Sequence, residues 1–163
     1  MTTRTSAGVR RLIAALAILL LGMSFAPPTY ASGTKLTHAQ ATAKLSAAGI
    51  TWSSSGGCSN RNNATCTSFE QINSGTIDSI IVFKNASGCA VNITGGTETG
   101  HASGTYSHWN GYKVDISIST CVNNWITSAY TYIGVRSDGA AMYQSAAGNI
   151  YAREGSHWDI LYY

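Results

Sequence analysis

The first part of the chain carries apolar residues at helical spacing. Ala41, Leu45 and Ala48 fall on one face of a helix, because residues three or four positions apart lie on the same side. Just before them, the side chains of Thr37 and Gln40 can each accept a hydrogen bond from the other's backbone amide. The pattern predicts a short helix with one apolar face that begins after Thr37.

Two further helical stretches and a strand are expected before residue 95. One helical stretch begins near Ser68. Another begins at Thr76, carries isoleucine at positions 77, 80 and 81, and ends at Ser87-Gly88, where glycine can supply a left-handed stop. Ala90 to Thr94 then has the composition of a strand.

From residue 112 onward the pattern changes to a period of two. Val114, Ile116 and Ile118 alternate with polar residues between Tyr112 and Ser119, which is typical of a half-buried strand. The remaining expected elements are a short helix at 121–128, a hairpin formed by 132–136 and 140–144, and a last strand at 157–163. Short helices followed by an antiparallel sheet indicate an α+β fold in a single domain.

Residues 1–31 have the pattern of a secretory signal. A start with three arginines precedes an apolar run from Leu12 to Phe25, and Thr29-Tyr30-Ala31 offers a small-x-small cleavage site. The expected location is therefore outside the cell, either secreted or in the cell wall. We divide the chain into the signal peptide at 1–31, an N-terminal helical and disulfide-loop region at 32–75, and a core at 76–163.

Charge and hydropathy exclude two classes of protein. The chain has ten Lys and Arg residues, seven Asp and Glu residues and a formal net charge of +3, but three of the arginines belong to the signal. Without them the net charge is near zero, so the basic surface that nucleic-acid binding requires is lacking. No apolar run after the signal approaches the roughly 18 residues of a membrane span. We expect a monomer without an integral membrane span.

All four cysteines follow the predicted signal, and an even number in an exported protein indicates two disulfides. A structural zinc site is the competing interpretation, but no two cysteines have the short C-x₂₋₄-C spacing of such sites. Of the three possible pairings we favour Cys58 with Cys66, which closes one loop, and Cys89 with Cys121, which ties two strands together.

A first group of residues suited to metal binding lies between 106 and 115. Asn110-Gly111 is a strong signal for a two-residue hairpin turn. In such a hairpin His108 would lie opposite Lys113, and Asp115 would be its diagonal neighbour on the same face. An imidazole and a carboxylate placed in this way could share one metal ion.

A second group begins the last predicted strand. By alternation His157 and Asp159 share one face, while Trp158, Ile160 and Tyr162 face the core. Three His and Asp ligands with one open position make a catalytic zinc site, and a nearby carboxylate can act as the base. This assigns His108, Asp115 and His157 as ligands and Glu154 as the base. From spacing alone, ordinary surface residues are an equally good interpretation.

The two groups together resemble the paired motifs of one peptidase family. Ser107-x-His108-x-x-Gly111-x-x-x-Asp115, followed by Glu154-x-x-His157-Trp158, is similar to the motifs of the zinc D-Ala-D-Ala carboxypeptidase and L-alanyl-D-glutamate endopeptidase family. That family shares its fold with the amino-terminal signalling domain of Hedgehog proteins. The resemblance covers residues 76–163, a zinc peptidase-like core, and leaves 32–75 unaccounted for.

The resemblance implies a secreted zinc-dependent peptidase that hydrolyses peptidoglycan stem or cross-link peptides. It assigns Zn²⁺ as the cofactor, His108, Asp115 and His157 as its ligands, and Glu154 as the catalytic base. The alternative is a non-catalytic, secreted cell-wall-binding domain on the same zinc fold, because a fold alone does not establish a function.

One departure from the family's pattern affects the expected substrate. Many members carry an arginine for the substrate carboxylate, but this chain has Glu98 in the matching stretch. A second carboxylate there would repel a substrate carboxylate, so we expect endopeptidase rather than carboxypeptidase action. Arg136 or Arg153 could replace the missing arginine and reverse that preference.

Several other polar and aromatic residues have two interpretations. His101 lines the substrate groove or is merely solvated, and Asp159 either orients His157 or forms a salt bridge with Arg153. We expect the four tryptophans to belong to the core and not to a carbohydrate platform. These are Trp52, Trp109, Trp125 and Trp158.

Overall fold

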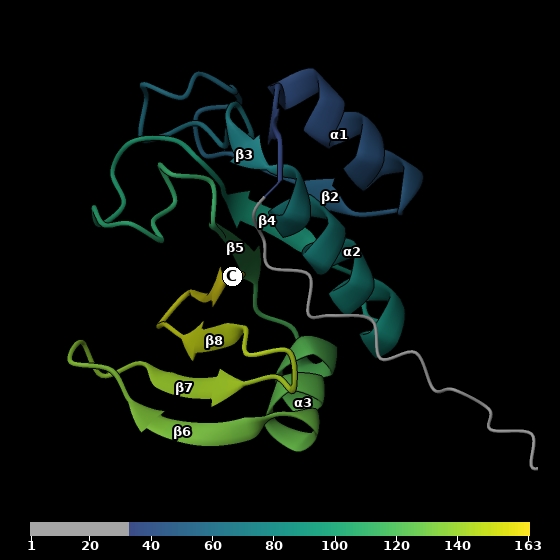
Figure 1. Ribbon diagram of the computed structural model, residues 1–163, viewed down its shortest axis with the longest axis vertical. Helices are drawn as coiled ribbons and strands as arrows, with labels where there is room; N and C mark the ends of the chain where they lie inside the picture. The colour runs from purple at the N-terminus through teal and green to yellow at the C-terminus, as the bar shows by residue number, and fades with distance from the viewer. Residues whose placement is uncertain (1–32) are drawn as a thin grey trace, which may run out of the picture.

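A seven-stranded sheet forms the centre of the protein (Figure 1). The computed structural model describes residues 33–163, so the predicted signal peptide at 1–31 lies outside the described residues. The strand order is β2-β4-β5-β9-β8-β7-β6; β2 pairs with β4 in parallel and all other neighbours are antiparallel. Two short strands, β1 and β3, form a separate antiparallel pair.

The described residues form nine strands and three helices in chain order. They are β1 (Lys35–Leu36), α1 (His38–Ala47), β2 (Thr51–Trp52), β3 (Ile72–Asn73), α2 (Ser74–Ser87), β4 (Asn92–Gly95), β5 (Lys113–Ser117), α3 (Thr120–Ala129), β6 (Thr131–Val135), β7 (Ala141–Gln144), β8 (Ile150–Arg153) and β9 (His157–Leu161).

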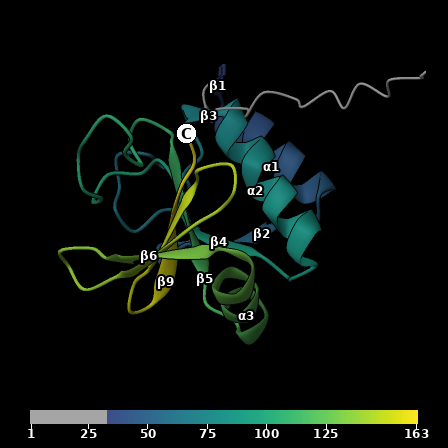
Figure 2. The same ribbon diagram turned by 60° about the horizontal axis from the view of Figure 1, so that its bottom comes forward.

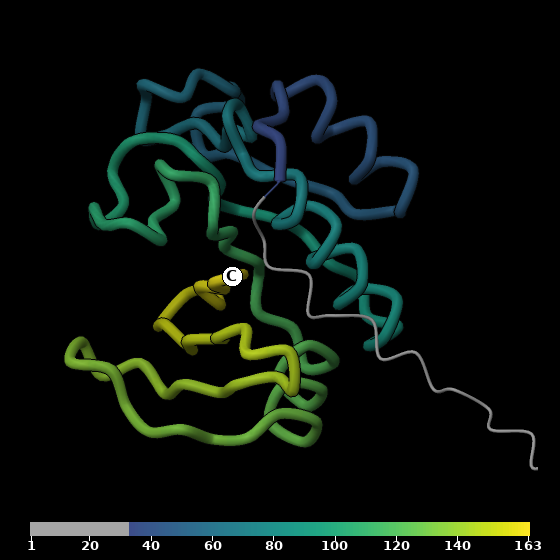
Figure 3. Tube along the Cα trace, in the orientation of Figure 1, coloured from purple at the N-terminus to yellow at the C-terminus, as the bar shows by residue number. Residues whose placement is uncertain are grey.

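The sheet has one helix-covered face and one loop-covered face. Figure 2 shows α1, α2 and α3 on one side, where Ile77 and Ile80 of α2 join Val114, Ile116 and Trp158 of the sheet in a buried apolar core. Two long loops cover the opposite face of the sheet, residues 53–71 and 96–112. These loops lie side by side (Figure 3), joined by the Thr99 amide, which donates to the Arg61 carbonyl at 2.8 Å.

Helix α1 begins as its capping residues predict. The Thr37 hydroxyl accepts a hydrogen bond from the Gln40 amide at 3.2 Å, and the Gln40 side chain accepts one from the Thr37 amide at 2.9 Å. Ala41 and Leu45 are fully buried on the apolar face. The same core receives residues from both predicted regions of the chain, so residues 33–163 form one mixed α/β domain with a mostly antiparallel sheet. The predicted combination of helices with an antiparallel sheet is confirmed.

The helix expected near Ser68 is wrong. Residues 67–69 are buried in a loop, and the backbone of Ser68 is engaged by the other long loop. The Ser68 amide donates to Glu98 Oε2 at 2.7 Å, and the Ser68 carbonyl accepts from the Thr97 amide at 2.6 Å. These tertiary hydrogen bonds replace the ones that a helix would make.

The hairpin expected at Asn110-Gly111 is also wrong. The Gly111 amide closes a turn onto the His108 carbonyl at 2.8 Å, and β5 pairs with β4 instead of with residues 106–109. Gly111 has a φ of +79°, and a Cβ there would lie 2.7 Å from the Gln71 carbonyl oxygen. The glycine is therefore required by its close approach to the start of β3.

Most of the other predicted helices and strands are confirmed. Helix α2 ends at Ser87, and Gly88 adopts the left-handed conformation with a φ of +66°. Strand β5, helix α3, the β6–β7 hairpin and strand β9 all form near their predicted positions. No sequence pattern predicted strand β8, which pairs with both β7 and β9, or the two-residue strands β1, β2 and β3.

Both predicted disulfides form, Cys58 with Cys66 and Cys89 with Cys121. They are compatible with an extracellular protein. Within residues 33–163 no helix is both long and apolar enough to cross a membrane.

Candidate metal centre

Strands β5 and β9 bring two carboxylates together on the loop-covered face of the sheet. Asp115 and Asp159 are directly paired in the antiparallel register. Their neighbours along each strand point to the core, which follows from the alternation of side chains in a strand. Gly95 of β4 lies beside Asp115, and a Cβ there would come within 2.5 Å of Asp115 Oδ2. The glycine thus leaves the space that the carboxylate occupies.

His108 reaches these carboxylates from the loop between β4 and β5. Its Nδ1 lies 2.7 Å from the Gly96 carbonyl oxygen, to which it donates, so Nε2 is the ring nitrogen that faces the carboxylates. Nε2 lies 3.2 Å from Asp115 Oδ1 and 3.5 Å from Asp159 Oδ1. The residue is only 4% exposed. A backbone acceptor on the far ring nitrogen is the usual arrangement for a metal-binding histidine.

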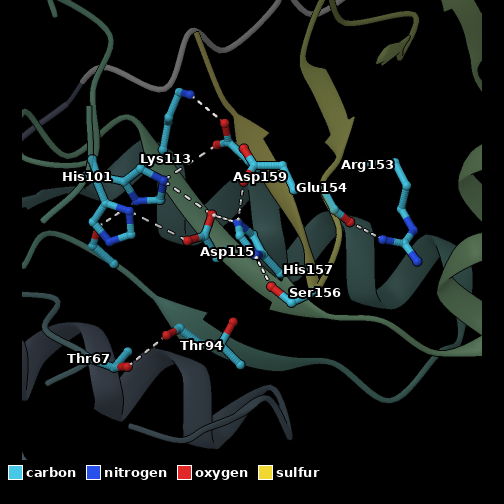
Figure 4. A network of polar contacts seen from close by, with 12 residues as sticks. Thr67, Thr94, His101, Lys113, Asp115, Arg153, Glu154, Ser156, His157 and Asp159 are labelled. Atoms are coloured by element: carbon cyan, nitrogen blue, oxygen red, sulfur yellow. Dashed lines mark hydrogen bonds and ion pairs between the residues drawn. The ribbon is translucent and has the colours of Figure 1, made fainter. Parts of the chain in front are cut away.

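His157 approaches the same oxygen from β9. Its Nε2 lies 3.5 Å from Asp115 Oδ1, and its Nδ1 lies 3.1 Å from the Ser156 hydroxyl. Figure 4 shows the side chains of Asp115, His157 and Asp159 pointing toward one another. The structure thus brings together the three residues predicted as ligands, although the hairpin that was to place His108 does not form.

His101 belongs to the same cluster. Its ring stacks on that of His108 with centroids 3.8 Å apart, and its Nδ1 lies 3.8 Å from Asp115 Oδ2. His101, His108 and Asp115 each offer a ligand atom within 4.8 Å of the others, so this group could hold a metal ion. The sequence analysis did not count His101 as a ligand. In the sequence His101 lies seven residues before His108 in a glycine-rich loop. In such a loop the distance along the sequence does not predict which side chains lie close together.

Two carboxylate oxygens fit a cation at this position. Asp115 Oδ1 and Asp159 Oδ1 are buried and have no hydrogen-bond partner. Burial lowers the pKa of His108, but the adjacent Asp115 and Asp159 carboxylates outweigh it and raise the pKa to about 9. The site thus attracts positive charge, and its N and O donors are those that zinc accepts.

Asp159 neither contacts Arg153 nor orients His157, contrary to both interpretations of the sequence. Its Oδ2 accepts hydrogen bonds from Lys113 Nζ at 2.7 Å and from Arg136 Nη1 at 2.8 Å. Burial raises the pKa of Asp159, but His108 and Lys113 outweigh it and hold the pKa well below its usual range. Asp159 therefore remains charged beside His108.

Glu154 lies at the edge of the cluster with both oxygens engaged. Oε2 is 3.2 Å from His157 Nε2, and Oε1 pairs with Arg136 Nη2. Arg136 also binds Asp138 and Asp159, so three carboxylates surround one guanidinium. Hydrogen bonds to Asp138 in particular raise the pKa of Arg136 far above its usual value.

Arg153 lies away from the clustered carboxylates, and Glu98 is held by the two long loops. Arg153 donates to the Glu154 carbonyl and lies over the Trp158 ring, away from the clustered carboxylates. Glu98 is 3% exposed, and its carboxylate accepts from the Ser68 and Gly96 amides and contacts His101. A carboxylate held in this way supports the loops, and its expected repulsion of a substrate carboxylate stays a prediction.

The cluster opens into a cavity of about 560 Å³. The floor is formed by the histidines and carboxylates described above, and one wall carries Lys113 and Arg136. Lys113 has one carboxylate partner, whereas Arg136 has three. The chain matches no protein-family model, no curated protein and no solved structure. Its function is therefore inferred from this geometry and from the sequence motifs.

Proposed function

We propose that the protein is a secreted, zinc-dependent peptidase that hydrolyses stem or cross-link peptides of peptidoglycan. The observation that carries the proposal is the convergence of two imidazole Nε2 atoms on one buried carboxylate oxygen, Asp115 Oδ1. The motif resemblance supports the substrate class and a Hedgehog-type zinc peptidase fold. Residues 1–31 act as the export signal in this proposal.

His108, Asp115 and His157 hold the metal. Three protein ligands leave one position for water or substrate, which distinguishes a catalytic zinc site from a structural one. When bound, zinc supplies Lewis acidity, which polarises a carbonyl and lowers the pKa of water. His101 is the competing third ligand, but its Nε2 contacts Glu98 and its Nδ1 faces the other oxygen of Asp115.

Glu154 is the general base. Its Oε2 accepts a proton from the attacking water and passes it to the leaving amine, as a carboxylate next to the ligands can do. Arg136 holds Oε1 and thereby fixes the orientation of the carboxylate. Lys113 has N–H groups left to bind a substrate oxygen on the wall of the cavity.

The proposed cleavage lies inside a stem or cross-link peptide. Carboxypeptidase action requires an anchor for a free carboxylate, usually a bidentate arginine. Arg136 is the arginine at the site, but Asp138, Glu154 and Asp159 already occupy it. Carboxypeptidase action on D-Ala-D-Ala is the alternative if Arg136 exchanges one of these partners for substrate.

A second candidate function is a non-catalytic domain that uses the metal to bind the cell wall. The engagement of both Glu154 oxygens favours it, because a base must be free to accept a proton. The two candidates differ in what Glu154 does and agree on the metal.

Zinc content and hydrolysis of a defined muropeptide separate the two candidates. We expect the Glu154→Gln protein to fold and bind zinc as the wild type does, yet to hydrolyse the muropeptide roughly 10²- to 10⁴-fold more slowly, the size of a general-base contribution. Asp138→Asn, which changes another carboxylate bound to Arg136, is the matched control. A wild-type protein that binds stoichiometric zinc and muropeptide without cleaving it would establish the binding domain instead.

A further inference from the structure

A smaller cavity of about 260 Å³ adjoins the candidate metal centre. Both cavities are lined by Gly100 and His101, so the two are neighbours across that part of the 96–112 loop. The other residues that line the smaller cavity include Trp109, Asn110, Ser103, Thr99 and the loop-held Glu98. A group bound at the metal centre could therefore continue into this second cavity.

Trp109 is exposed in this position, contrary to the expectation that it belongs to the core. Its exposed fraction is 44%, whereas Trp158 is almost completely buried. The open indole lines the smaller cavity, so a ligand bound in that cavity would contact it.

The indole is held in a fixed orientation. The Arg61 guanidinium lies over one face of the ring, 3.7 Å from the centroid, and also donates to the Trp109 carbonyl. Arg61 is itself anchored, because its Nε donates to the Thr97 carbonyl at 3.2 Å. Since Arg61 covers one face, the exposed area of the ring lies on the opposite face and the edge.

A rigid, open aromatic face next to hydroxyl and amide groups suits a pyranose ring. The axial C–H groups of a sugar carry partial positive charge and pack on the electron-rich face of an indole. Its hydroxyl and acetamido groups require polar partners at the ring edge, and Thr99, Ser103 and Asn110 are polar residues in the lining of the cavity.

We infer that Trp109 and the adjoining cavity form a saccharide-binding subsite, and that the preferred substrate is a peptide still attached to an N-acetylated amino sugar. The inference rests on the proposed function, which supplies the peptide of the substrate, and it adds the amino sugar to which that peptide is attached. It also locates the scissile bond near the sugar end of the peptide, because the subsite shares residues with the metal cavity.

Saccharide binding can be tested without catalysis. Four tryptophans produce four indole N–H signals in an NMR spectrum, and the signal missing in Trp109→Ala identifies Trp109. On titration of the full protein with triacetylchitotriose at millimolar concentrations, we expect this signal to shift. Tyr132→Ala, which removes an aromatic side chain that is 54% exposed on β6, is the matched control and should bind as the wild type does. A Trp109 signal that does not move would overturn the subsite even if the protein proves to be a peptidase.

Hydrolysis supplies an independent measurement. The same peptide is presented with and without its amino sugar, and we expect a lower KM for the glycan-bearing form. Trp109→Ala should reduce that preference up to about 10-fold, the upper range of an aromatic stacking contribution, and Trp109→Phe should restore part of it. An unchanged preference in Trp109→Ala would contradict the inference. If the wild-type protein hydrolyses neither peptide but still binds the sugar, the proposed peptidase activity is contradicted and the saccharide subsite is not.

Discussion

Single side chains at the metal centre are positioned by contacts that the sequence motif does not contain. His108 is directed by the Gly96 carbonyl, and Asp115 occupies space that Gly95 leaves open. Both glycines lie outside the motif residues. The motif thus contains the residues proposed as metal ligands, while the neighbouring backbone determines which ring nitrogen of His108 faces the carboxylates.

Substitution of the candidate ligands tests which third residue binds the metal. We expect His157→Ala to weaken zinc binding by at least about 100-fold, since loss of a mere outer-shell partner already costs 10- to 100-fold. His101→Ala should retain stoichiometric zinc, because the two ring nitrogens of His101 face Glu98 and Asp115 Oδ2, and not Asp115 Oδ1. Native mass spectrometry of both proteins measures the metal content. The reverse result, with zinc lost only from His101→Ala, would assign the site to His101, His108 and Asp115.

At the scale of elements, periodicity and capping predicted the parts of the fold that depend on local sequence. Thr37 and Gln40 marked the start of α1, and Val114 and Ile116 marked the buried face of β5. Several errors lie in the two long loops, where Ser68 is held by hydrogen bonds to residues some thirty positions away. No local pattern records such contacts, which is why the role of His101 and the exposure of Trp109 were also missed.

Helix α1 is docked onto one of these loops through His38, which makes the contact sensitive to pH. The Phe69 amide donates to His38 Nδ1 at 3.0 Å, and the two rings stack with centroids 5.4 Å apart. Burial lowers the pKa of His38 from its usual 6.5, although the nearby Glu70 carboxylate opposes this effect. Only the neutral ring can accept the Phe69 hydrogen bond.

Because the pKa of His38 is lower in the folded protein, the unfolded chain takes up the proton first as the pH falls. The contribution of this residue to stability is therefore complete above about pH 6.5 and is lost as the pH drops below that value. We expect the loss to be on the order of 1 kcal/mol, the value of one hydrogen bond. His38→Asn keeps an acceptor but does not titrate, so denaturant unfolding at pH 7 and pH 5 should show a smaller pH effect for this variant. Equal pH effects in both proteins would contradict the assignment.

At the scale of the whole molecule, the two disulfides serve different parts of the structure. Cys89 and Cys121 join the start of the β4 segment to α3 across 32 positions, and Cys89 belongs to the main core. Cys58 and Cys66 close a loop across eight positions that contains Arg61, the residue that holds Trp109. The longer bond thus ties the core together, whereas the shorter one shapes the loops beside the metal centre.

Replacement of each cysteine pair by alanine should separate stability from function. Loop-closure entropy predicts a loss of about 3.7 kcal/mol for the Cys89–Cys121 bond and about 2.5 kcal/mol for the Cys58–Cys66 bond. We expect Cys89→Ala/Cys121→Ala to have the lower free energy of unfolding but normal zinc content and substrate preference once folded. Cys58→Ala/Cys66→Ala should lose less stability yet bind triacetylchitotriose more weakly, because Arg61 no longer has a closed loop to fix it against the indole. Urea unfolding and the NMR titration measure the two effects. Unchanged saccharide binding in the Cys58→Ala/Cys66→Ala protein would mean that Arg61 orients Trp109 without help from the disulfide.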